Sequence, residues 1–184
     1  MFNIKSCYRA VTNESLDARS TIWKIRASQR IRSFMWLCVN GKLLTNSEHV
    51  KRGLMPHGDC SRCESSCETS LHALRDCSKV KDMWMRLVKP CHWPAFFNVN
   101  FHEWICMNFK KNLGLLDLGW KEVFATACWY FWRFRNEFVF QGIDRMTSDP
   151  IFEIFHRVKC YNKASIVLDC QTKAHPGRGL RCIC

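Results

Sequence analysis

Three cysteines and one histidine in a short segment have the residue types and the spacing of a zinc site. Cys60 and Cys63 form a Cys-x2-Cys pair, and His72 and Cys77 follow after eight and four intervening residues. Zn²⁺ binds four sulfur or nitrogen donors at the corners of a tetrahedron. Because the protein would supply all four donors, no corner is left for an activated water. We therefore expect a closed, structural zinc site without metal catalysis.

The same segment contains two other residues that could replace a ligand, His57 and Cys67. The spacing of the second ligand pair also sets a condition, because positions five apart in an unbroken α-helix diverge by roughly 140°. His72 and Cys77 can meet only if the backbone turns between them. Thr69 can cap a short helix that carries His72, and Ser78 can cap the next helix, with Cys77 at the junction.

The charge balance favours an acidic partner. The 184 residues include 28 Lys and Arg but only 16 Asp and Glu, a formal net charge of +12. Nucleic acid is the commonest partner of such a chain, and Trp23 or Trp36, if exposed, could stack on unpaired bases. We expect phosphate contacts from a basic set that precedes the zinc segment: Arg26, Arg30, Arg32, Lys42, Lys51 and Arg52.

The lengths of the apolar stretches in the sequence predict neither secretion nor a membrane span. The N-terminus has no apolar stretch of signal-peptide length, and the longest nearly apolar run, residues 123–132, is about half of what a bilayer requires. Thirteen cysteines, an odd number, suit reduced thiols and a metal site better than a disulfide framework. We expect a soluble intracellular protein with no membrane partner and no small-molecule substrate.

The spacing of apolar residues predicts a mainly α fold, a small helical domain held together by a Cys3His zinc site and followed by a second helical segment. Within it, Thr45 and Glu48 have the spacing of a capping box, residues 22–26 read as a short extended piece and residues 91–98 as a connector. The strongest helix is predicted over residues 120–140, apolar on more than one side. The expected organisation is a zinc domain over 1–90, helices over 91–169 and a disordered tail over 170–184.

Several stretches together resemble one family, the zinc-binding region that follows the polymerase in reverse transcriptases of plant LINE-type (non-LTR) retrotransposons. The order and spacing match over roughly residues 1–142. The matching positions are residues 2–10, 22–24, 34–36, 40–45, 52–53, Cys60, Cys63, 68–72, Cys77, Trp84 and 132–140.

The resemblance implies zinc ligands at Cys60, Cys63, His72 and Cys77, the set that tetrahedral chemistry also selects. Cys67 stands where the family usually has an acidic or polar residue. The chain departs from the pattern at Ser28-Gln29, where a Pro-Pro pair is usual, and at Leu44, where Pro is common. Members of the family normally carry a polymerase upstream and often a ribonuclease H domain downstream.

Three functions follow as alternatives. The first is a non-catalytic zinc module that binds nucleic acid without sequence preference, and the second is a purely structural scaffold that links polymerase and nuclease parts. The third, an enzyme with Cys106 or Cys128 as nucleophile, is disfavoured because both lie in apolar stripes. We therefore expect no catalytic residues. Apart from these functions, the chain also looks like a detached, degenerate fragment without activity, since no Asp-Asp pair for polymerase metals occurs in it.

Overall fold

The computed structural model describes residues 20–64, 67–145 and 149–174, with side chains described up to residue 165. The matching positions of the N-terminal segment and the end of the predicted tail lie outside these residues. Within the described part the fold is mainly α, as predicted, with isolated β-bridges and no β-strand. None of the described helices is both long enough and apolar enough to span a bilayer.

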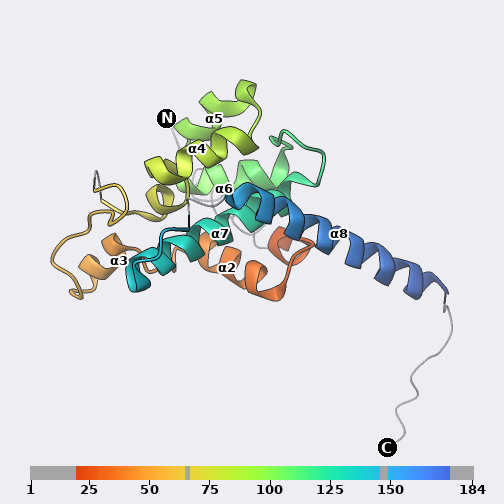
Figure 1. Cartoon of the computed structure of the whole chain (residues 1–184), viewed down its shortest axis with the longest axis horizontal. Helices are drawn as coiled ribbons and strands as arrows, with labels where there is room; N and C mark the ends of the chain where they lie inside the picture. The colour runs from red at the N-terminus through yellow and green to blue at the C-terminus, as the bar shows by residue number, and fades with distance from the viewer. Residues whose placement is uncertain (1–19, 65–66, 146–148, 175–184) are drawn as a thin grey trace, which may run out of the picture.

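The helices follow one another closely along the chain (Figure 1). Their bounds are α2 Gln29–Val39, α3 Asn46–Lys51, the π-helix η1 His72–Asp76, α4 Ser78–Leu87, the 3-10 helix η2 Pro90–His92, α5 Trp93–Asn98, α6 Phe101–Lys110, α7 Trp120–Gln141 and α8 Pro150–Ala174. Helix α8 continues five residues beyond the predicted boundary at 169.

Helix α7 is the element on which the others pack. It contacts α2, α6, η1 and α8, and Figure 1 shows it running through the middle of the molecule. Its buried residues lie on more than one side, as the sequence predicted, and include Val123, Phe124, Phe131 and the polar Thr126. The helix ends at Gly142, whose φ of 69° is a left-handed conformation that glycine adopts without a Cβ penalty.

The core is aromatic and is centred on Trp84 of α4, whose side chain is fully buried. The Trp84 indole N–H donates to the Leu74 carbonyl oxygen at 2.7 Å, so burial leaves its polar atom paired. Its ring lies within 5.2 to 6.4 Å, centroid to centroid, of five others, those of Phe96, Trp104, Trp120, Phe124 and Phe131. Edge-to-face contacts of this kind stabilise a core by about 0.5–1.5 kcal/mol a pair beyond area burial.

One continuous hydrophobic cluster extends across the predicted domain boundary at residue 90. It joins Ile22 and Met35 near the start of the described chain to Ile154 and Val158 of α8. The second helical segment therefore packs directly on the zinc-binding part, a relation that the spacing of apolar residues along the chain did not reveal.

Local predictions fail at three places. Residues 20–23 are helical and lead into a turn, so Ile22 and Ile25 are buried while Trp23 points outward; the predicted extended piece is wrong. The predicted connector over 91–98 is the helical pair η2 and α5, with Pro94 in the first turn of α5, where its missing N–H costs nothing. Thr45 occupies the N-cap of α3 but bonds Ser47 instead of a backbone amide, so the predicted capping box does not form.

Replacing the central tryptophan tests this packing. We expect Trp84→Ala to lower the free energy of unfolding by about 3–5 kcal/mol, because it leaves a cavity among five rings. Trp23→Ala is the matched control: Trp23 is 46% exposed, and its loss should cost well under about 1.5 kcal/mol. Urea unfolding followed by circular dichroism measures both, and equal losses would contradict this account of the core.

Candidate metal centre

The first pair of cysteines lies in a tight turn. The Glu64 amide donates to the Cys60 carbonyl oxygen at 2.8 Å, which folds the Cys-Ser-Arg-Cys segment back on itself. Glu64 closes the turn with a φ of 55°, a left-handed conformation that is uncommon outside glycine. The turn carries Cys60, which is buried, and Cys63, which is partly buried, toward the same side.

The second pair is brought together by the π-helix η1. The Thr69 hydroxyl accepts the His72 amide at 3.1 Å, so Thr69 caps this segment as predicted. The Cys77 amide then donates to the His72 carbonyl oxygen at 2.9 Å, an i to i+5 bond. This bond aligns two residues that an α-helix would point apart. Cys77 is itself at the N-cap position of α4, where Ser78 was expected.

The four predicted ligands converge. Their ligand atoms all lie within 4.8 Å of one another. The Cys60 and Cys77 sulfurs are 3.9 Å apart, and the Cys63 sulfur is 3.3 Å from His72 Nε2. Tetrahedral zinc with Zn–S bonds of 2.3 Å places its sulfurs about 3.8 Å apart. The donor set and the spacing therefore fit zinc. The group does not include His57 or Cys67, and both of these side chains are exposed.

The site also has suitable electrostatics. The hydrogen bond between Cys60 and Cys77 lowers the pKa of the Cys60 thiol and raises that of Cys77, while the contact with Cys60 raises the pKa of His72. Of this pair, Cys60 is thus the thiol that ionises first. Arg62 is nearly buried between the two cysteines of the turn; it donates to the Ala73 carbonyl oxygen at 3.1 Å, and its charge favours the Cys77 thiolate. One cation here offsets the net negative charge of zinc with three thiolates.

A buried ion pair connects helix α7 to the loop between Cys60 and His72, which we call the metal loop. Arg135 Nε donates to Glu68 at 2.9 Å, a second guanidinium nitrogen bonds the same carboxylate, and both side chains are at most 1% exposed. Asn46 of α3 completes the group, accepting from Arg135 at 2.7 Å and donating its backbone N–H to Glu68 at 3.0 Å. The Glu68 carboxylate is in turn 4.0 Å from the Cys60 sulfur. The group therefore fixes the loop beside the ligands.

Sequence reasoning did not assign roles to Glu68, Arg135 or Arg62. Glu68 and Arg135 both lie in stretches that carry the family resemblance, 68–72 and 132–140. The available signal was a charged residue at apolar helical spacing, because Arg135 lies four residues after Phe131 and three before Phe138, and such a residue is rarely buried unless it is paired.

The centre as built can hold a metal but offers no position for a reacting group. Four protein ligands close the coordination sphere, and bound zinc would supply folding free energy in place of a Lewis acid. Cys106 and Cys128 are both buried. Burial raises the pKa of Cys128 well above its ordinary value, and a thiol held in its neutral form is inert. The Cys106 sulfur lies 3.6 Å from His102 Nε2.

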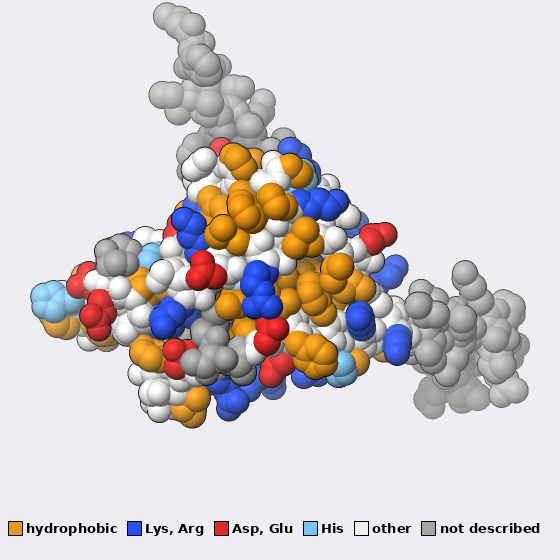
Figure 2. Space-filling model, turned by 45° about the horizontal axis from the view of Figure 1, so that its top comes forward, with side chains coloured by type: hydrophobic (Ala, Val, Ile, Leu, Met, Phe, Trp, Pro, Cys, Tyr) orange, Lys and Arg blue, Asp and Glu red, His pale blue; other side chains and the backbone are white. Residues whose placement is uncertain are grey.

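The six basic residues predicted to contact nucleic acid fall into two groups. Arg26 and Arg30 are exposed, before α2 and in its first turn, whereas Arg32 turns back to donate to the Ala27 carbonyl oxygen at 2.9 and 3.0 Å. The second group surrounds Glu48 of α3. Lys51 forms a 2.6 Å ion pair with Glu48, and the charges of Lys51, Arg52 and Lys42 lower the pKa of the Glu48 carboxyl. On the face seen in Figure 2, Lys and Arg are dispersed among hydrophobic side chains and form no continuous basic field.

Comparison with known proteins agrees with the geometry. The family model described as zinc-binding in reverse transcriptase matches residues 2–84. Those residues are a reverse-transcriptase zinc-binding domain. They include all four ligands, so the chain has a Cys3His zinc site. The zinc-binding domain defined by this match ends within α4, and Arg135, which holds its loop, lies beyond that end.

A curated relative extends the similarity past this domain. A protein of Arabidopsis thaliana named "putative ribonuclease H protein" is 29% identical over 140 residues, which are 73% of this chain and 23% of the relative. The matched region thus spans about a quarter of the length of that relative. No solved structure matches the chain.

Removing the first ligand pair tests the zinc site. We expect Cys60→Ser with Cys63→Ser to lose one equivalent of zinc and the cooperative thermal transition, because structural zinc supplies on the order of 10 kcal/mol in small domains. Native mass spectrometry measures the metal and circular dichroism the melt. Cys67→Ser is the control and should keep both; unchanged melting of the double variant would contradict the assignment.

Removing the cation of the buried pair tests its link to the metal loop. We expect Arg135→Met to destabilise the protein by about 3–5 kcal/mol, since it leaves the Glu68 carboxylate buried without its partner. The same variant should release zinc to a chelator faster than the parent protein. Arg133→Met, two residues away and paired with Glu137 at the surface, should cost less than about 1 kcal/mol. Similar losses from the two variants in urea unfolding would disprove the assigned role.

Proposed function

We propose that this chain is a non-catalytic zinc module that binds nucleic acid without sequence preference. The observation that carries the proposal is the combination of a reverse-transcriptase zinc-binding domain with a net charge of +12. Arginine and lysine side chains neutralise phosphates and release their counterions, which gives binding without base readout. The name of the Arabidopsis relative refers to a ribonuclease, a class of protein that acts on RNA.

Exposed side chains of the right type support the proposal. Arg30 is exposed in the first turn of α2, where the helix dipole adds positive potential, and Arg26 is exposed three residues before that helix begins. Trp23 and Trp36, considered above as stacking residues, are 46% and 40% exposed. Their indole faces are thus available in part to unpaired bases. The zinc site, being closed, would act by holding these elements in place.

A structural scaffold is the second candidate, and the buried Arg135–Glu68 pair favours it. That pair joins the metal loop to α7. A spacer between the polymerase and nuclease parts of a longer protein would need its elements joined in this way. Under this alternative the surface charge has no ligand. The two candidates therefore differ in whether the isolated chain retains nucleic acid.

A salt titration separates them. We expect the zinc-loaded chain to bind a labelled 20-nucleotide RNA with an affinity that falls as salt rises, with a slope of about −0.7 for each phosphate contact. Arg26→Glu with Arg30→Glu should abolish retention of the RNA. Lys89→Glu with Lys111→Glu is the matched control, with the same change in charge on exposed residues at the ends of α4 and α6. A zinc-loaded chain that does not retain the RNA, or a response that is flat in salt, would favour the scaffold, whereas equal losses in the two variants would show that Arg26 and Arg30 are not the specific contacts.

A further inference from the structure

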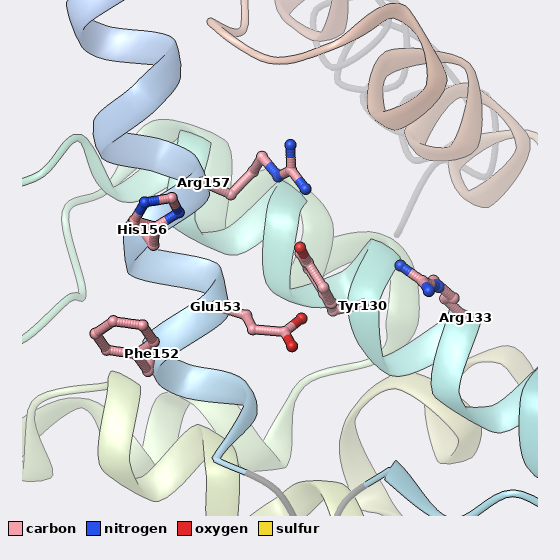
Figure 3. A pocket seen from close by; sticks show the side chains of 6 residues that line it. All are labelled: Tyr130, Arg133, Phe152, Glu153, His156 and Arg157. Carbon is pink, nitrogen blue, oxygen red and sulfur yellow. The ribbon is translucent and has the colours of Figure 1, made fainter.

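Two neighbouring hollows lie where α8 crosses α7 and the start of α2. The first, of about 270 Å³, is shown in Figure 3 and is lined by Tyr130, Arg133, Phe152, Glu153, His156 and Arg157. The second, of about 410 Å³, is lined by Ser28, Gln29, Arg30, Trp129, Arg157 and Tyr161. They share Arg157, and Trp129 and Tyr130 are consecutive on α7. We call the two together the α7–α8 groove.

Positive charge predominates in the α7–α8 groove. Arg30, Arg133 and Arg157 come from three different helices, and all three are exposed. Glu153 is the single carboxylate among the lining residues of the two hollows, and Glu137, which does not line them, pairs with Arg133 at 2.8 Å. The excess of cations in a recess favours an anionic ligand over a neutral one.

The central arginine, Arg157, lies beside a tyrosine of α7. Tyr130 is nearly buried, and its interaction with Arg157 raises the pKa of the guanidinium. In Figure 3 the Tyr130 hydroxyl and the Arg157 side chain point to the same side of α7. The phenol therefore lies next to the central cation of the α7–α8 groove.

Flat side chains also line the two hollows, and Figure 3 shows Phe152 and His156 next to each other on one side of α8. Phe152 is 71% exposed, and its ring stacks on His156 at 6.2 Å and 20°. Arg133 lies over the Trp129 ring at 5.7 Å, so a guanidinium plane and an indole are layered at the boundary of the two hollows. Base stacking uses surfaces of both kinds, because every base has a π-face whatever its sequence.

We propose that the α7–α8 groove binds single-stranded nucleic acid, with Arg30, Arg133 and Arg157 on successive phosphates and Phe152 stacked on an unpaired base. The inference rests on the proposed function and specifies its surface. The charge favours a polyanion, and the accessible aromatic faces favour one whose bases are not already paired.

Charge reversal inside and outside the α7–α8 groove provides the test. The probe is a fluorescently labelled 20-nucleotide oligo(dT), titrated by anisotropy against the full chain loaded with zinc. We expect Arg133→Glu with Arg157→Glu to weaken binding more than tenfold and to reduce the salt slope by about 1.4, two phosphate contacts of about 0.7 each. Lys51→Glu with Arg52→Glu, the control with an equal change in charge, should stay within about twofold of the parent.

A second variant separates stacking from charge. Phe152→Ala keeps every charge and removes an exposed ring, so folding should be unaffected; we expect at least about fivefold weaker binding of oligo(dT) and no change for a 20-base-pair duplex. If the double glutamate variant melts early, Arg133→Gln with Arg157→Gln replaces it and should still weaken binding several-fold.

The outcomes are distinct. An unmodified chain that fails to bind oligo(dT) or RNA overturns the proposed function and this inference with it. Binding that survives the α7–α8 groove variants but is lost in Lys51→Glu with Arg52→Glu overturns the inference alone, and leaves nucleic-acid binding assigned to the residues around α3. Equal loss for oligo(dT) and duplex in Phe152→Ala would overturn the stacking role.

Discussion

His72 and Cys77 are five positions apart in the sequence, and the metal centre depends on how the backbone brings them together. An α-helix would direct these side chains apart, and an extended chain would place them too far from each other. The π-helix η1 meets the constraint with a single i to i+5 bond between the two ligand residues. Because π-helical turns are rare and appear at functional sites, this one is explained by the ligand geometry that it creates. The adjoining helix α4 then begins at Ser78, directly after Cys77, and carries Trp84 into the core.

Helix α7 gives the metal loop its second support. The loop between Cys60 and His72 has few apolar residues to bury, so its position depends on polar contacts, and Arg135 supplies them through Glu68 and Asn46. A buried pair of this kind adds less net stability than an apolar contact of the same volume, but it admits few alternative arrangements. The pair therefore specifies where the loop sits on α7. It also explains why the zinc-binding domain and the helices after it share one core.

The fold determines which of the basic side chains lie together on the surface. Residues close in sequence, such as Arg30 and Arg32, differ in role because the second is bonded to the backbone at the start of α2. Residues far apart in sequence, such as Arg30 and Arg157, line the same hollow. Net charge predicts the kind of partner, whereas the position of charges relative to exposed rings indicates which surface the partner would use.

Local pattern determined a large part of this protein. Tetrahedral chemistry and spacing selected Cys60, Cys63, His72 and Cys77, and apolar periodicity placed α7 close to its observed bounds, because both depend on residues near each other in the chain. Only the tertiary structure decided the rest. The pairing of Glu68 with Arg135 across 67 positions, the single core and the meeting of α2, α7 and α8 arise from contacts between distant segments, and no local pattern encodes those. The helical turn at residues 20–23 shows the same limit, since Ile22 and Ile25 are buried only because later helices cover them.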